Sequence, residues 1–117
     1  MANLFRCGGS SNKTVIPKIS LVPKTGTNNA TLYLYIPNEV KTVKIIGAYT
    51  SATNISGSVA LVSDASSSSK AFNTNAQSLT YDMTDHKNKN PRIIFTATGT
   101  SSSSSGSLTV ERIEMIF

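Results

Sequence analysis

The chain has 117 residues, a mass of 12.4 kDa and a formal net charge of +5, which suffices for one domain and is too little for two. It has one cysteine, Cys7, and one histidine, His86, so it can form neither an internal disulfide nor a cysteine/histidine zinc site. The sequence contains no apolar run of about 18 residues, so it predicts no membrane-spanning helix. Arg6 interrupts the apolar stretch that a signal peptide would need.

Positive charge is concentrated in residues 1–44, which carry Arg6 and five lysines against the single acid Glu39, whereas the rest of the chain is balanced. The basic residues are spread along the segment and are not interleaved with aromatic residues, as they would be on a nucleic-acid stacking platform. The pattern therefore favours solvated lysines over a nucleic-acid partner.

Short β-branched and aromatic runs, bounded by turn residues, recur along the chain, and helical periodicity is missing. In chain order, strands are predicted near Thr14–Leu21, Ala30–Ile36, Val40–Thr50, Gly57–Ser63, Ser78–Met83, Arg92–Thr98 and Leu108–Phe117. Strands of this length and spacing are typical of an all-β fold. We predict a single antiparallel β-sandwich of about seven to eight strands with an extended N-terminal arm.

The alternation of residues predicts which side of a strand faces the core. In Ala30–Ile36, the leucines and Ile36 fall on one face, and Tyr33 and Tyr35 fall on the other. The last predicted strand changes phase after Val110, and a β-bulge near Glu111–Arg112 would keep its apolar side chains on one face.

Two serine runs, Ser66–Ser69 and Ser101–Ser105, fall between predicted strands and are expected to be polar loops. At the start of the chain, residues 1–12 are predicted to be an anchoring arm, and residues 13–117 the β-sandwich domain. The arm carries Leu4 and Phe5 before a glycine- and serine-rich stretch, so it would fray unless these two side chains insert into a neighbouring molecule.

Groups able to perform catalysis are sparse. Asp82 and Asp85 flank His86, but no Gly-x-Ser-x-Gly turn is present to support a serine–histidine–aspartate triad. The same two acids could contribute to a calcium site, although EF-hand spacing is absent. We therefore predict that the protein is not an enzyme and has no catalytic residues, cofactor or metal site.

The opening residues Met1-Ala-Asn-Leu-Phe-Arg-Cys-Gly-Gly9 resemble the start of short proteins encoded among the structural genes of tailed bacteriophages. The resemblance implies a non-enzymatic virion component of a tail, a baseplate or a capsid surface, made in the host cytoplasm and located in the virion. Its implied partners are other virion proteins and further copies of the chain. The arm residues that would form the assembly interface are Asn3, Leu4, Phe5 and Arg6.

The segments Asn90-Pro-Arg-Ile-Ile-Phe-Thr-Ala-Thr98 and Gly106-Ser-Leu-Thr-Val-Glu-Arg-Ile-Glu-Met115 together resemble the closing hairpin of carbohydrate-binding jelly rolls. This likeness implies a jelly-roll-like sandwich and an alternative function, a carbohydrate-binding module for host-surface or cell-wall glycans. Because the chain has no tryptophan, tyrosines would have to supply the stacking surface. The candidate glycan contacts are Tyr33, Tyr35, Tyr49 and Tyr81.

Overall fold

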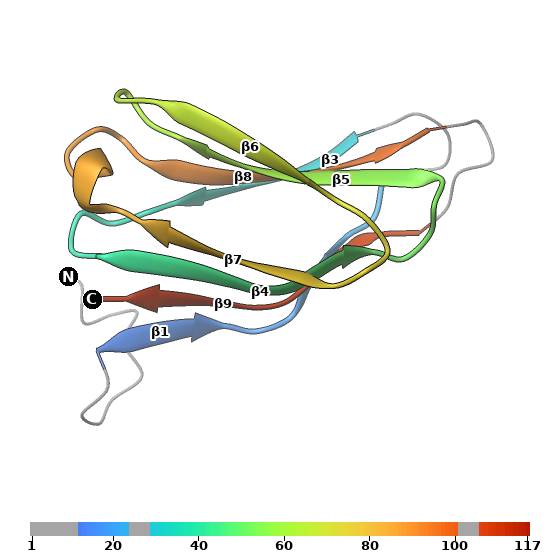
Figure 1. Ribbon diagram of the computed structural model, residues 1–117, viewed down its shortest axis with the longest axis horizontal. Helices are drawn as coiled ribbons and strands as arrows, with labels where there is room; N and C mark the ends of the chain where they lie inside the picture. Colours follow the sequence, from blue (N-terminus) through green and yellow to red (C-terminus); the bar gives the residue numbers. More distant parts are fainter. Residues whose placement is uncertain (1–11, 24–28, 101–105) are drawn as a thin grey trace.

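A computed structural model describes residues 12–23, 29–100 and 106–117, in which nine strands form two antiparallel sheets that pack face to face (Figure 1). The strands of the first sheet, in spatial order, are β1 (Lys13–Ile16), β9 (Leu108–Ile116), β4 (Thr42–Thr50) and β7 (Gln77–Asp82), with β2 (Ile19–Leu21) also paired to β9. Those of the second sheet are β3 (Asn29–Tyr35), β8 (Arg92–Gly99), β5 (Ile55–Val62) and β6 (Ser67–Phe72). A short 3-10 helix, η2 (Thr84–His86), follows β7.

This strand order is that of a jelly roll, because the chain crosses repeatedly between the two sheets and sequence neighbours are rarely neighbours in space. The predicted all-β antiparallel sandwich is confirmed. The described residues contain no helix that is long and apolar enough to cross a membrane. The arm residues Asn3, Leu4, Phe5 and Arg6, like the run Ser101–Ser105, lie outside the described residues.

The first serine run, Ser66–Ser69, was predicted to be a loop, and this prediction is wrong. Its last three residues belong to β6, which pairs with β5 from Gly57↔Phe72 to Val62↔Ser67. The strand carries no apolar alternation because Phe72 is its one buried side chain. Backbone pairing with β5 creates the strand, so side-chain propensity gives no signal for it.

The predicted strand Thr14–Leu21 is divided into β1 and β2. Both pair with β9 in the same register, but Pro17 and Lys18 between them are not part of the ladder. Proline has no N–H to donate, which explains a break at this position.

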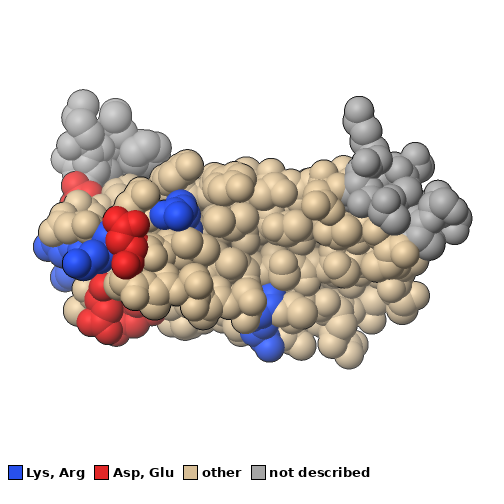
Figure 2. Space-filling model, turned by 90° about the horizontal axis from the view of Figure 1, so that it is seen from above, with Lys and Arg blue, Asp and Glu red and all other residues tan. Residues whose placement is uncertain are grey.

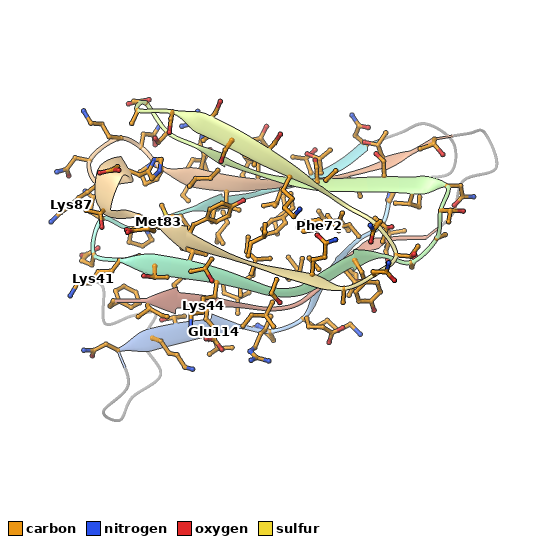
Figure 3. All side chains as sticks on the ribbon, viewed as in Figure 1. Lys41, Lys44, Phe72, Met83, Lys87 and Glu114 are labelled. Carbon is orange, nitrogen blue, oxygen red and sulfur yellow. The ribbon has the colours of Figure 1, made fainter. Side chains whose placement is uncertain are left out.

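The core lies between the two sheets and is built from the inward side chains of both. Its largest fully buried members are Phe95, Ile45, Ile93, Leu108, Ile113, Val43, Val59 and Val110. Burying each side chain of this size contributes about 1.5–3 kcal/mol. Tyr81 and Leu79 of β7 pack against this cluster from the edge, and Figure 3 shows Phe72 pointing into the space between the sheets.

In β4 and β9, the alternation of inward and outward side chains shifts by one residue, at positions that lie opposite each other in the sheet. On β9, Val110 and Ile113 are both buried although they are three residues apart, so the predicted phase change is confirmed. The register between β4 and β9 stays constant, however, and the shift lies instead between β4 and β7, around Gly47. Gly47 has φ +67°, the left-handed conformation of a glycine β-bulge. Because β9 keeps one register with β4, the bulge predicted at Glu111–Arg112 is wrong, and the bulge lies in β4 against β7 instead.

The outer face of the first sheet carries alternating charges. Glu114 of β9 is almost fully buried there, with its Oε2 accepting a hydrogen bond from Arg112 Nε at 2.9 Å and its Oε1 3.6 Å from Lys13 Nζ. The hydrogen bond from Arg112, with the charges of Lys13 and Lys44, lowers the pKa of the Glu114 carboxyl below its usual value. Figure 3 shows Lys44 and Glu114 on adjacent strands of this face.

Candidate functional site

The two tyrosines of β3 are the most exposed aromatic side chains among the described residues. Tyr33 is 54% exposed and Tyr35 is 64% exposed, whereas the alternating residues Leu32 and Leu34 pack against the core. The alternation predicted for this strand is therefore confirmed. Two rings project from one strand, on one side of it, into solvent.

Tyr33 and Tyr35 belong to the broad outer face of the second sheet, which we call the tyrosine face. Cross-strand pairing places Arg92 beside Tyr35 and Ile94 beside Tyr33. The outward side chains of the four strands are Asn29, Thr31, Tyr33, Tyr35, Arg92, Ile94, Thr96, Thr98, Ser56, Ser58, Ala60, Val62, Ser67, Ser69 and Ala71. Among them Arg92 is the one charged residue. Figure 2 looks down on this side of the molecule, where charged side chains gather towards one end and most of the surface is uncharged.

An open pocket of about 420 Å³ adjoins Tyr35 where β3 ends. We call it the asparagine pocket, and its lining residues are Tyr35, Ile36, Pro37, Asn38, Asn88, Asn90 and Pro91. The lining combines an aromatic ring, two prolines and three side-chain amides, and it contains no charged residue. Two loops form it, one between β3 and β4 and one between η2 and β8.

Reciprocal hydrogen bonds join the two loops across the pocket. Asn38 Nδ2 donates to Asn88 Oδ1 at 2.7 Å, and the backbone N–H of Asn88 donates to Asn38 Oδ1 at 3.0 Å. Asn88 and Asn90 adopt the left-handed conformation, with φ of 63° and 54°, which asparagine tolerates better than most residues. Arg92 Nη1 also donates to the carbonyl oxygen of Asn90 at 2.9 Å. The pocket is therefore held in shape before any ligand arrives.

The chemistry of the pocket suits a neutral, hydroxyl-bearing ligand. An amide offers both a donor and an acceptor, and within the described residues the Nδ2 group of Asn88 and the side chain of Asn90 have no hydrogen-bond partner. The exposed Tyr35 ring supplies an apolar surface with a polar tip. This pairing of an aromatic ring with side-chain amides is typical of sites that orient polar organic ligands.

The four candidate tyrosines do not form one surface. Tyr33 and Tyr35 lie together on the tyrosine face. Tyr49 lies on the outer face of the first sheet, opposite Thr109 of β9. Tyr81 lies opposite the buried Val43 and packs against the core, where burial raises the pKa of its hydroxyl.

Asp82 and His86, near η2, have structural partners. Asp82 Oδ1 accepts hydrogen bonds from the backbone N–H and the hydroxyl of Thr84, at 2.9 and 2.6 Å, and so caps the turn. His86 Nδ1 lies 2.7 Å from Ser63 Oγ, which also accepts backbone N–H bonds from Ala65 and Ser66. That serine holds its own turn together. In the described ranges, no three histidine, cysteine or acidic side chains come together as a metal site.

A second pocket of about 300 Å³ shares Asn38 with the asparagine pocket but differs in chemistry. Its rim carries Lys41 and Lys87, with the buried Met83 between them, as Figure 3 shows. The two pockets therefore differ in their lining: the second includes Lys41 and Lys87, whereas the lining of the asparagine pocket contains no charged residue.

Sequence reasoning missed the asparagine pocket. Asn38 and Asn88 are 50 residues apart, and only the folded chain brings them together. The available signals are the dipeptide Pro37-Asn38 and the segment Asn88-Lys-Asn-Pro91, whose residue types predict turns but contain no information about a contact between the two.

No protein-family model matches the chain, and no curated protein sequence matches it. Among solved structures it is similar to TmCBM61 in complex with β-1,4-galactotriose, with a TM-score of 0.58 and 5% identity, over 95% of this chain and 86% of that one. It is also similar to the glycoside hydrolase domain of Endo-D from Streptococcus pneumoniae R6, with a TM-score of 0.53 and 11% identity, over 85% of this chain. The match covers only 17% of that second, much longer chain.

A weaker likeness, with a TM-score of 0.49 and 14% identity over 94% of this chain and 34% of the other, is to VP2 of the infectious bursal disease virus subviral particle. That likeness is too weak to support an inference. The two stronger ones show the fold. The chain is a jelly roll. Such sandwiches occur both in viral capsid proteins and in lectin domains.

Proposed function

We propose that the protein is a non-enzymatic binding domain that holds a neutral glycan on Tyr33, Tyr35 and the asparagine pocket. The observation that carries the proposal is the position of Tyr35. Its ring is exposed on the tyrosine face and also lines a charge-free pocket whose other polar side chains are amides.

The C–H faces of sugar rings stack on aromatic rings. The hydroxyl groups of sugars form hydrogen bonds with side-chain amides. A neutral glycan needs no charged partner, which fits a surface with Arg92 as its one charge. The bonds between Asn38 and Asn88 order the loops in advance, and this lowers the entropy cost of binding. The fold likeness to TmCBM61, whose structure contains a bound galactotriose, supports the same proposal.

The test is isothermal titration calorimetry, in which the full chain is titrated with β-1,4-galactotriose and with a panel of neutral polysaccharides. Tyr35→Ala should lower the affinity for a bound glycan about tenfold, because it removes the ring shared by the face and the pocket. Asn88→Ala should lower it as well, because it removes an amide and releases the loops.

The matched control is Tyr49→Ala, which removes a tyrosine from the other sheet. This variant should bind like the unmodified chain once circular dichroism has shown it to be folded. An absence of binding across the panel would refute the proposal. Equal losses in Tyr35→Ala and Tyr49→Ala would refute the assignment of the site.

A second candidate function, a structural part of a phage virion, is favoured by the resemblance of residues 1–9. In this role Asn3, Leu4, Phe5 and Arg6 would anchor the domain to other virion proteins or to further copies. The described chain enters the first sheet directly after this segment, where the Phe117 N–H donates to the Asn12 carbonyl at 2.7 Å. The double variant Leu4→Ser/Phe5→Ser should then abolish assembly and leave thermal unfolding nearly unchanged. Unaltered assembly would remove this candidate.

A further inference from the structure

Within the described residues, each sheet ends on both sides in a strand with one open edge. These edges belong to β1 with β2 and to β7 in the first sheet, and to β3 and β6 in the second. An open edge presents unpaired N–H and C=O groups to any other strand. Natural proteins protect such edges with short strands, charges, prolines or bulges.

Three of the four edges carry such protection. β1 and β2 have four and three residues and are separated by Pro17 and Lys18. β7 ends in Asp82 and shifts register against β4. β6 carries Lys70 opposite the buried Val59, which directs a charged side chain towards the inner side of an edge strand.

Strand β3 carries none of these protections. Its seven residues pair with β8 in one unbroken register, from Asn29↔Thr98 to Tyr35↔Arg92. The strand contains no charged residue and no proline. Of the four edges it is the longest regular one and the one best suited to accept another strand.

The free backbone groups of β3 can be assigned from the hydrogen bond that follows the strand. The Ile36 N–H donates to the Pro91 carbonyl at 3.1 Å and continues the register of β3 with β8. Because the direction of these groups alternates along an antiparallel strand, Thr31, Tyr33 and Tyr35 turn their N–H and C=O groups to the open edge.

We propose that this edge pairs antiparallel with the β3 edge of a second copy of the chain. In the proposed register, Leu32 of one chain lies opposite Leu32 of the other. This register pairs all seven residues of β3 and places Thr31 of each chain opposite Tyr33 of the other. A twofold axis through this point makes the edge its own complement. The two second sheets become one continuous sheet, with the exposed tyrosines of both copies side by side at its centre.

An apolar pocket of about 180 Å³ lies beside the same edge, between the sheets. It is lined by Thr14, Ile16, Leu34, Tyr35, Pro37 and Met115. Thr14 Oγ1 is buried there without a hydrogen-bond partner. A second copy on the β3 edge would cover the mouth of this pocket and remove more apolar surface from water, which favours a protein partner at this edge.

The test is the mass of the full chain by light scattering as its concentration is raised to about 1 mM, because a seven-residue strand pair is smaller than a standard interface and will associate weakly. The mass should rise towards twice the 12.4 kDa of one chain. Thr31→Pro removes an edge N–H without touching the bonds to β8 and should keep the chain monomeric. Thr31→Val keeps the N–H and should associate normally.

Amide hydrogen exchange of the unmodified chain gives a second measurement that does not depend on a variant. The Thr31, Tyr33 and Tyr35 amides should become protected as concentration rises, whereas the outer-edge amides of β6 should not. A monomeric mass throughout, a Thr31→Pro variant that still associates, or unprotected β3 amides in the dimer would each overturn the proposal. None of these measurements involves a glycan, so the binding function is tested separately.

Discussion

Gly47 of β4 and Glu111 of β9 lie so close that a Cβ atom on Gly47 would sit 2.8 Å from the Cγ atom of Glu111. Gly47 also has φ +67°, a conformation that L side chains rarely adopt. Two independent penalties, strain and overlap, therefore act on any side chain placed at this bulge.

We expect Gly47→Ala to lower the free energy of unfolding by about 2 kcal/mol, from backbone strain and contact with Glu111 together. Urea denaturation measures the change. In a Glu111→Ala background the cost of Gly47→Ala should shrink but not vanish, because the 2.8 Å overlap with Cγ is removed while the 3.0 Å contact with the Cβ atom of residue 111 and the backbone strain persist. An identical cost in both backgrounds would contradict the role of the contact.

Glu114 should make stability depend on pH in the acid range. Its pKa is lowered mainly by the hydrogen bond from Arg112, so its contribution is present above the ordinary glutamate pKa and is lost as pH falls through the folded-state pKa. Glu114→Gln should cost about 1 kcal/mol at pH 7, and the difference from the unmodified chain should fade in acid. Thermal unfolding across pH measures this. Glu111→Gln is the control, because the Lys18–Glu111 pair is exposed and 3.9 Å apart and should contribute little.

Asn88 combines a left-handed backbone with hydrogen bonds to Asn38, and two substitutions separate these features. Both Asn88→Ala and Asn88→Gly lose the side-chain bond, but glycine adopts φ 63° without strain. The alanine variant should therefore be less stable than the glycine variant by about 1 kcal/mol. Chemical denaturation of the two compares them directly. Equal stabilities would show that the conformation stores no strain.

Tyr81 should weaken the fold at high pH. Burial raises the pKa of its hydroxyl, so the folded chain keeps a proton that the unfolded chain releases, and stability falls as pH rises above the ordinary tyrosine pKa. Replacement by phenylalanine removes this titration, so Tyr81→Phe should lose less stability between neutral and alkaline pH. Melting temperatures of the two proteins provide the measurement, and parallel losses would contradict the assignment.

Much of the sandwich could be predicted from the sequence because its strands alternate. The segments around β3, β7 and β8 each show an apolar face of period two, and β4 shows one on either side of Gly47; the positions of all four agree with the structure within two residues. The β6 strand could not be predicted in this way, since its side chains are almost all small, polar and exposed. Its existence depends on the open edge of β5, which is a tertiary property.

The candidate site divides in the same manner. Exposure of Tyr33 and Tyr35 follows from local alternation and was predictable. The burial of Tyr81 also follows from its alternation with Thr80 and Asp82, whereas the absence of tryptophan, which is a property of composition, places it among the candidate glycan contacts. The contact of Asn38 with Asn88 depends on two loops meeting at one end of the sandwich, and no local pattern contains that information.

The phase change shared by β4 and β9 ties the lengths of these two strands to one another. Removing one residue at Gly47 would turn Ala48 and Thr50 from the core to the solvent while Val110 and Leu108 stayed inside. A matching deletion in β9 would be needed to keep the inward side chains of β4 and β9 on the same face beyond Gly47. The break at Pro17, between β1 and β2, lies at the same level on the other side of β9. Length variation in this sheet is therefore expected only as coordinated changes across neighbouring strands, never as an insertion or deletion in one strand alone.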